Sequence, residues 1–241
     1  MDWTDEGIVL SVRAHGETAA IAELLTRGHG RHLGLVHGGR SRLKRPLLQP
    51  GNHLGVSWRG RLSEQLGTFE IDMKDPYASR VFERRFGLLG LESLTSLARL
   101  LPERDPHPNL FEVTLFVLGF LEDDDIWPAL YARWELALLE ELGFGLDLSS
   151  CAVTGAKDDL AFVSPRTGRA VSAAASVPYR ERLLRLPALF TGAGVTGTNR
   201  VEIEDALRLT GHFLTRDVLE PRGLAMPDAR QRVLAMAAAQ S

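Results

Sequence analysis

The chain of 241 residues is long enough for one large core or two to three small ones, and its composition is that of an ordinary globular protein. A formal net charge of -3 excludes a generally basic nucleic-acid coat, so any polyanion site has to be local. The single cysteine, Cys151, excludes an intrachain disulfide and suits a reducing compartment. The start of the chain lacks a signal-peptide pattern, and no apolar stretch has the length of a membrane span. We therefore expect a cytoplasmic protein with no membrane contact.

The first seventy residues carry short β-type segments separated by Gly-rich turns. The expected strands are 7–13, 18–26, 31–39, 53–60 and 63–72. Five strands in this length predict a small closed barrel over residues 1–76, with the strand count of an OB-fold. An SH3-like barrel has nearly the same count, and periodicity does not separate the two.

From Ala78 the hydrophobic period becomes helical. The expected helices are 78–101, 109–123, 126–144, a short one at 178–186, and one from about 200 to 219. The first two are apolar on most faces, as in the interior of a bundle. Asn199 with Glu202 three residues later predicts the N-terminal cap of the last helix. The predicted class is α+β: an OB-fold barrel packed on a mainly α-helical domain, 77–241, that includes a turn-rich segment at 147–177.

Charge is distributed unevenly along the chain. Between Leu24 and Ser63 there are eight Lys or Arg and no acid, whereas between Leu101 and Leu160 there are three basic residues and thirteen acids. Such an asymmetry indicates partners rather than fold. A charge run is usually only a solvated surface, but a cationic groove with an aromatic platform on a small barrel is typical of single-strand binders.

We therefore predict a DNA-binding surface on the barrel, centred on the segment HGGRSRLKRPLLQPG at 37–51. Trp58 could offer a stacking face there, or could equally belong to the core. The predicted contact residues are Arg27, Arg31, Arg40, Arg42, Lys44, Arg45, Trp58, Arg59 and Arg61.

Motifs for other chemistry are weak. GAGVTG at 192–197 matches a dinucleotide fingerprint, but a helix and a proline break precede it where a strand is needed. His29, His32 and His37 do not share one strand face, and the acids at 123–125 lack the spacing of a calcium loop. Cys151 has no nearby histidine to act as a base. We expect a binding protein with no enzymatic activity, no cofactor and no metal.

Arg133 stands out in the predicted helix 126–144. Its neighbours three and four residues away are apolar, so no acid on its own helix can pair with it. Two interpretations remain open: an ion pair with another acid of the bundle, or a site for the carboxylate of a partner peptide.

Four stretches together resemble the RecO family of recombination mediators. They are GIVLSVRAHGETAAIAELLTRGHGRHLGLVHGGRSR, LLQPGNHLGVSWRGRLSEQLG, YARWELALLEELGFGLDLSSCAVTG and FVSPRTGRAVS. The resemblance implies an N-terminal OB-fold and a DNA repair factor that is not an enzyme. It implies binding to single- and double-stranded DNA, annealing of complementary strands, and action with RecR. It also implies binding to the acidic tail of single-strand binding protein, with Arg133 as candidate receptor, and indirect assistance to RecA.

Many family members carry a zinc ribbon, and here the chain departs from them. The ligand positions of the resemblance fall on Cys151, Thr154, Ser172 and Ala175, so one thiol remains of four donors. We expect a degenerate ribbon without zinc, held by apolar packing around Phe162 and Val163. Two rival functions stay open: an adaptor that binds RecR and the tail with little DNA contact, and an enzyme using GAGVTG or Cys151.

Overall fold

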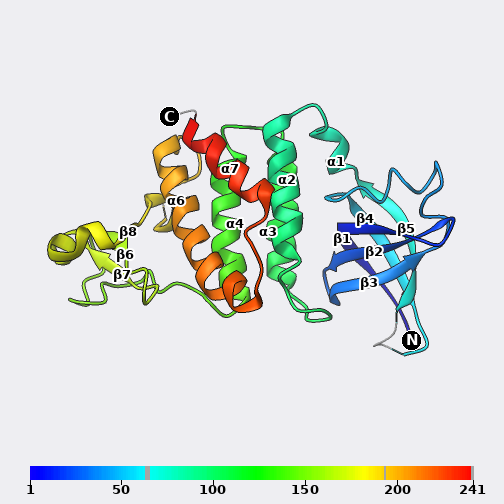
Figure 1. Cartoon of the computed structure of the whole chain (residues 1–241), viewed down its shortest axis with the longest axis horizontal. Helices are drawn as coiled ribbons and strands as arrows, with labels where there is room; N and C mark the ends of the chain where they lie inside the picture. The colour runs from blue at the N-terminus through cyan, green and yellow to red at the C-terminus, as the bar shows by residue number, and fades with distance from the viewer. Residues whose placement is uncertain (63–65, 193, 240–241) are drawn as a thin grey trace. The chain divides into compact units, whose positions relative to one another are not determined.

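A computed structural model describes residues 1–62, 66–192 and 194–239. The first residues of the expected fifth strand, 63–65, and residue 193 of GAGVTG lie outside the described part. The chain forms two compact units, Met1–Asp123 and Asp124–Ser241. Figure 1 shows the helices and strands of both units.

Unit 1 is built around a closed five-stranded barrel with the strand order β1-β2-β3-β5-β4. All neighbours are antiparallel except β3 and β5, which pair in parallel at Gly34 and Leu35. The strands are β1 Asp2–His15, β2 Ala19–Thr26, β3 Gly30–Val36, β4 His53–Arg59 and β5 Gly67–Asp75. This confirms the predicted OB-fold, with a first strand that begins earlier than expected.

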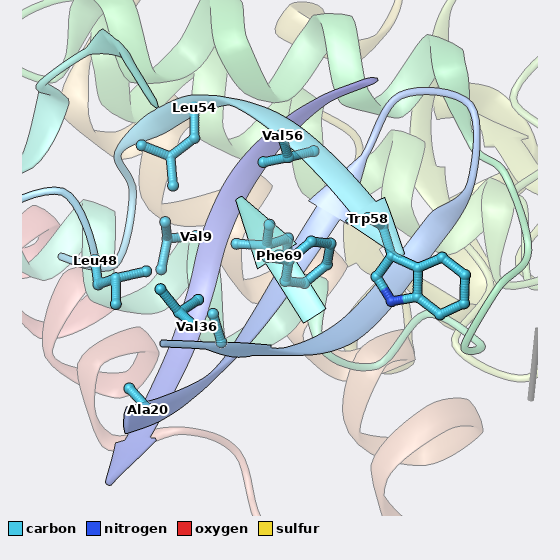
Figure 2. Packing of buried hydrophobic residues seen from close by; sticks show 10 residues of the cluster. Val9, Ala20, Val36, Leu48, Leu54, Val56, Trp58 and Phe69 are labelled. Carbon is cyan, nitrogen blue, oxygen red and sulfur yellow. The ribbon is translucent and has the colours of Figure 1, made fainter. Parts of the chain in front are cut away.

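Alternating apolar side chains fill the barrel. Its core contains Val9, Leu24, Val36, Leu54 and Phe69 among others (Figure 2). Gly34 is required at the parallel pairing, because a Cβ there would lie 2.3 Å from the Phe69 ring. Leu48 and Trp58 lie at opposite sides of this core in Figure 2. The two barrel ends are therefore lined by different chain segments.

The helix expected at 78–101 is two helices, α1 Tyr77–Arg80 and α2 Arg85–Ala98, because the backbone is extended at Arg84. α3 follows at Pro108–Phe120. α2 contacts β1, and Gly87 of α2 lies so close to the Leu121 carbonyl that a Cβ would approach it to 2.3 Å. These helices group with the barrel in the compact unit Met1–Asp123.

Unit 2 combines a helical layer with a small three-stranded sheet of order β7-β6-β8. The helices are α4 Trp127–Glu141, α5 Ala173–Ser176, α6 Arg200–Phe213 and α7 Asp228–Ala239. The strands are β6 Leu160–Val163, β7 Ala170–Ser172 and β8 Leu184–Arg185. The shorter helical turns are η1 Val177–Arg182, η2 Ala188–Phe190, η3 Leu214–Leu219 and η4 Glu220–Arg222.

Three details of unit 2 bear on the sequence predictions: the cap of α6, the segment 178–186 and the helix α7. Asn199 caps α6, accepting a hydrogen bond from the Glu202 N–H at 2.9 Å. The Glu202 carboxylate does not close the capping box but accepts from the Leu189 N–H at 2.7 Å. The expected helix at 178–186 is a 3₁₀ turn over Val177–Arg182, and α7 is an additional helix that the sequence pattern did not predict.

Candidate nucleic-acid interface

The segment 37–51, called the basic loop below, is a series of turns fixed to one end of the barrel. Leu48 is buried in the barrel core, and Gly39 packs so closely on Ala20 that a Cβ would lie 2.8 Å from the alanine methyl. Asn52 donates to the carbonyls of Pro46 and Leu47 at 2.9 and 3.1 Å. The loop thus has internal bonds and an apolar anchor, although it contains no helix or strand.

The cations of the basic loop face solvent. Arg40, Arg42 and Arg45 are exposed and Lys44 is half-buried. Arg40 donates to the Gly16 and Glu17 carbonyls at 3.1 and 2.8 Å, and Lys44 donates to the His37 carbonyl at 2.9 Å, so their charges are fixed in place but not neutralised. Within the described part of the chain, none of the four forms an ion pair with a carboxylate. This is the charge arrangement that phosphates require.

Arg59 and Arg61 are exposed as well, but at the other end of the barrel. Arg59 of β4 lies opposite Asp2 in the strand register, at the start of β1. Arg59 and Arg61 line a cavity together with Asp2 and Trp3. Arg40 and Arg45 instead line a cavity with Ala14, near the end of β1. The predicted single surface is therefore two separate cationic surfaces. Strand direction explains the difference. The basic loop follows the end of β3, which lies across β2 from the end of β1. Arg59 is at the end of β4, which runs antiparallel to β1 and therefore lies beside its start.

Arg27 is neutralised within unit 1. Its guanidinium pairs with Glu6 of β1 at 2.9 Å and with Glu112 of α3, and it lies 5.0 Å from the centre of the Phe111 ring. Both acids compete with phosphate for Arg27, so this geometry does not favour the predicted DNA contact. Its position instead connects the barrel to α3.

Arg31 is also occupied. Its side chain is only 16% exposed, pairs with Glu23 and donates from Nε to the Leu101 carbonyl at 2.8 Å. Glu23 also accepts from Arg99 and Ser11 at 2.8 and 2.7 Å. Burial alone would raise the pKa of Glu23, but these partners lower it below the usual range. Arg31 is thus engaged within unit 1, which does not favour its predicted DNA contact.

Trp58 is a core residue. It is 1% exposed and packs against Trp3 and Phe69, which corrects its prediction as a stacking face. The aromatic rings that reach the surface at this end of the barrel are Trp3 and His29. Their ring centres are 4.0 Å apart and their planes are inclined by 7°. Trp3 was missed from the sequence because the predicted first strand began after it.

Arg133 of α4 is half-buried, and its Nε donates to the Leu189 carbonyl at 2.9 Å. The fully buried ion pair of unit 2 is formed two residues further on, between Glu135 of α4 and Arg230 of α7. No pattern in the sequence pointed to this pair. Burial opposes the charge of Arg230, but the Glu135 carboxylate more than compensates and raises the pKa of Arg230 above its usual value.

The four ribbon positions are brought together in space. The Ser172 N–H donates to Cys151 Sγ at 3.3 Å, and the Ser172 hydroxyl accepts from the Ala175 N–H at 3.5 Å. Hydrogen bonds from Ser172 and then Thr154 lower the pKa of the Cys151 thiol to about 6. Cys151 and Phe162 pack with Val171 in a small apolar cluster, so both packing and hydrogen bonds support the turn.

The remaining motifs gain no support from their surroundings. The described residues of GAGVTG lie in turns between η2 and α6, and the 3₁₀ turn η2 rather than a strand directly precedes them. Among residues 1–62, 66–192 and 194–239, no three His, Cys, Asp or Glu side chains are grouped as a metal site would need. In the same ranges, every helix is too short or too polar to cross a bilayer.

Comparison with known proteins connects this architecture to one family. Residues 1–77 match the model "Recombination protein O N terminal", and residues 88–224 match "Recombination protein O C terminal". A protein of Mesorhizobium japonicum named DNA repair protein RecO is 51% identical over 98% of this chain and 93% of its own length. Relatives of the same name from Methylobacterium nodulans and Rhodospirillum centenum are 51% and 52% identical, covering 100% and 96% of this chain and 100% and 93% of their own. The chain belongs to the RecO family of DNA repair and recombination proteins.

Proposed function

We propose that this protein binds single- and double-stranded DNA without strong sequence preference and anneals complementary strands. With RecR, it helps load RecA onto DNA coated by single-strand binding protein. It does so by binding alone, with no enzymatic step and no cofactor. The observation that carries the proposal is the basic loop, whose Arg40, Arg42, Lys44 and Arg45 are presented without a neutralising carboxylate in the described structure.

The chemistry follows from charge placement. Cations that contact phosphates release condensed counterions, so affinity falls with salt and carries no base preference. Cations that screen two phosphate chains at once also lower the cost of bringing complementary strands together. The acid-rich residues 101–160 repel DNA and confine it to the barrel.

The test is fluorescence anisotropy of a labelled single strand over a salt series. Replacing Arg40, Arg42, Lys44 and Arg45 together by Ala should reduce the slope of log affinity against log salt by about 2–3, at roughly 0.7 for each phosphate that is no longer neutralised. Strand annealing, followed by energy transfer between labelled complements, should slow in parallel. An unchanged slope would refute the assignment of the basic loop.

The matched control removes four exposed cations of unit 2: Lys157, Arg166, Arg182 and Arg222. It changes net charge by the same amount, so an equal loss of binding would mean that total charge, and not the basic loop, determines affinity. The adaptor alternative predicts a different pattern, in which the parent protein captures RecR and the tail peptide but does not bind DNA even at low salt.

Arg133 is the proposed receptor for the terminal carboxylate of the single-strand binding protein tail. It is a half-buried cation whose neighbours three and four residues away on α4 are apolar, and a carboxylate would add a charge-assisted hydrogen bond to its guanidinium. Arg133→Met should weaken binding of a labelled tail peptide at least tenfold and leave DNA binding unchanged. Equal peptide affinity in the variant would place the tail elsewhere.

A further inference from the structure

The end of the barrel opposite the basic loop contains two adjoining cavities. One, of about 390 Å³, is lined by Trp3, His29, His32 and Arg104 among others. The second, of about 890 Å³, is lined by Arg59, Arg61 and Trp3. Trp3 and Trp58 line both. Volumes of this size are those of ligand-binding clefts.

A stack of three rings leads from the barrel core to this surface. Trp58 is at the buried end, Trp3 lies 5.6 Å from it with planes inclined by 12°, and His29 lies 4.0 Å beyond Trp3. The His29 side chain is 38% exposed and is held by Asp5, whose carboxylate is 2.9 Å from Nδ1. The exposed end of the stack is therefore a fixed planar surface, suited to another flat ring.

Buried polar atoms next to the cavity lack partners. His32 is 4% exposed, and neither of its ring nitrogens has a hydrogen bond of normal geometry in the described structure. The buried Trp58 Nε1 also lacks a hydrogen-bond partner there. Burial, followed by the nearby Arg104 and His29 charges, lowers the pKa of His32 to about 4, so its ring is neutral near pH 7. A neutral imidazole offers one donor and one acceptor. Unpartnered buried groups of this kind are uncommon and call for an explanation.

The backbone at the rim of the cavity is strained. Arg104 has φ of 61°, the left-handed region that non-glycine residues rarely occupy. Its N–H donates to the Arg31 carbonyl at 2.9 Å, and Gly30 lies so close to Asp105 that a Cβ would be 2.2 Å from the Asp105 carbonyl oxygen. This conformation holds the exposed Arg104 beside the cavity, and the described residues provide it with no carboxylate.

We propose that this end of the barrel accepts a nucleobase of single-stranded nucleic acid. The base lies in the cavity of Trp3, His29 and His32, and Arg104, Arg59 and Arg61 contact the flanking phosphates. The base stacks on the exposed face of His29, which Trp3 supports from the other side, and fills the unused hydrogen-bonding positions of His32. Because stacking is available to every base, such a site adds affinity without strong sequence preference. This inference rests on the proposed DNA binding and adds a base-dependent component to it.

The experiment compares a labelled strand of twenty thymidines with an abasic strand of equal length and charge. The parent protein should bind the thymidine strand at least fivefold more tightly, since stacking of one base on an aromatic side chain is worth that much or more. Trp3→Leu and His32→Leu should each bring the ratio close to one while affinity for the abasic strand stays the same. Phe116→Leu, an exposed aromatic change on α3, is the matched control and should leave the ratio unchanged.

The outcomes separate the two proposals. If the parent protein binds neither strand, the proposed function itself fails. If the parent protein binds both strands equally, or if both variants keep the parent ratio, DNA binding stands and the base site is refuted. A cavity that takes a peptide in place of a base would give the same result. Circular dichroism melting shows whether each variant is folded. A charge-preserving check on the rim, Arg104→Lys, should keep the ratio, whereas Arg104→Glu should weaken binding to both strands.

Discussion

The buried pair of Glu135 and Arg230 should dominate the stability of unit 2. Glu135 is 0% exposed and Arg230 is 2% exposed at the side chain. The guanidinium donates to both carboxylate oxygens and to the Leu207 carbonyl, the last at 2.6 Å, and the Thr210 hydroxyl donates to the same carboxylate. Three helices, α4, α6 and α7, thus meet at one charged centre. Arg230→Met removes the cation and preserves much of the side-chain volume.

The expected cost is about 3–5 kcal/mol, because the variant leaves a carboxylate out of water with one hydroxyl as its remaining donor. The surface pair of Arg208 and Glu204 is the control. Its arginine is 61% exposed, so Arg208→Met should cost no more than about 0.5 kcal/mol. The double variant Glu135→Leu with Arg230→Met should return to within about 1 kcal/mol of the parent, since an apolar pair needs no compensation.

Urea unfolding followed by hydrogen exchange and mass spectrometry measures each unit separately. Peptides from residues 200–219 should lose protection at lower urea in Arg230→Met, while peptides from residues 2–15 should not change. A central role for the pair is refuted if Arg230→Met costs as little as Arg208→Met. It is equally refuted if the double variant is as unstable as the single one, because the loss would then come from packing rather than from an unpaired charge.

Three further outcomes follow from the other buried groups. Arg31→Leu should cost about 2 kcal/mol, measured by thermal melting, because Glu23 loses a charged hydrogen bond; a loss of DNA affinity with unchanged stability would contradict this. His32 has a folded pKa of about 4 against 6.5 unfolded, so the unfolded chain takes up a proton first. The protein should then lose up to about 3 kcal/mol as pH falls from 6.5 to 4, and His32→Leu should flatten that part of the curve. Ser172→Ala should raise the pKa of Cys151 from about 6, seen as a shift in the pH titration of the ultraviolet absorbance of the thiolate; an unchanged titration would contradict the hydrogen-bond assignment.

The barrel was predictable because its determinants are local. Alternating apolar residues and Gly-rich turns predict five strands, and the structure confirms a closed five-stranded barrel. The strand count did not separate an OB-fold from an SH3-like barrel, and the resemblance to the RecO family favoured the OB-fold. Strand ends were less predictable, and β1 extends back to Asp2. The helix break at Arg84 also escaped prediction, because the apolar period of residues 78–101 runs across it.

The charged surface was less predictable, for a different reason. A window between Leu24 and Ser63 contains no acid, yet Arg27 finds Glu6 before it and Glu112 in α3, far along the chain. Which cations remain exposed depends on such long-range pairs. Arg42 and Arg45, on a turn that projects from the barrel, stay unpaired in the described structure.

Helix α7 was missed because its buried stripe contains a charge. Arg230, Val233 and Ala237 are the buried positions, at spacings of three and four residues, but an arginine there breaks the apolar pattern that predicts a helix. Only the position of Glu135 explains why an arginine is tolerated. Because the partner of Glu135 lies far along the chain, the sequence drew attention to Arg133 and not to Glu135 as the ion-pairing residue of α4.

The separation of the two cationic surfaces sets a minimum length for the strand that can touch both. They lie near Asp2 and Ala14 of β1, no more than about 40 Å apart along the strand at ~3.3 Å per residue. A stacked polynucleotide advances ~3.4 Å per nucleotide, so about twelve nucleotides reach from one surface to the other, and fewer when the strand is stretched. An oligonucleotide that is too short to span the separation can contact only one surface at a time. If DNA binds both surfaces as proposed, affinity should step upward once the oligonucleotide becomes long enough to occupy both.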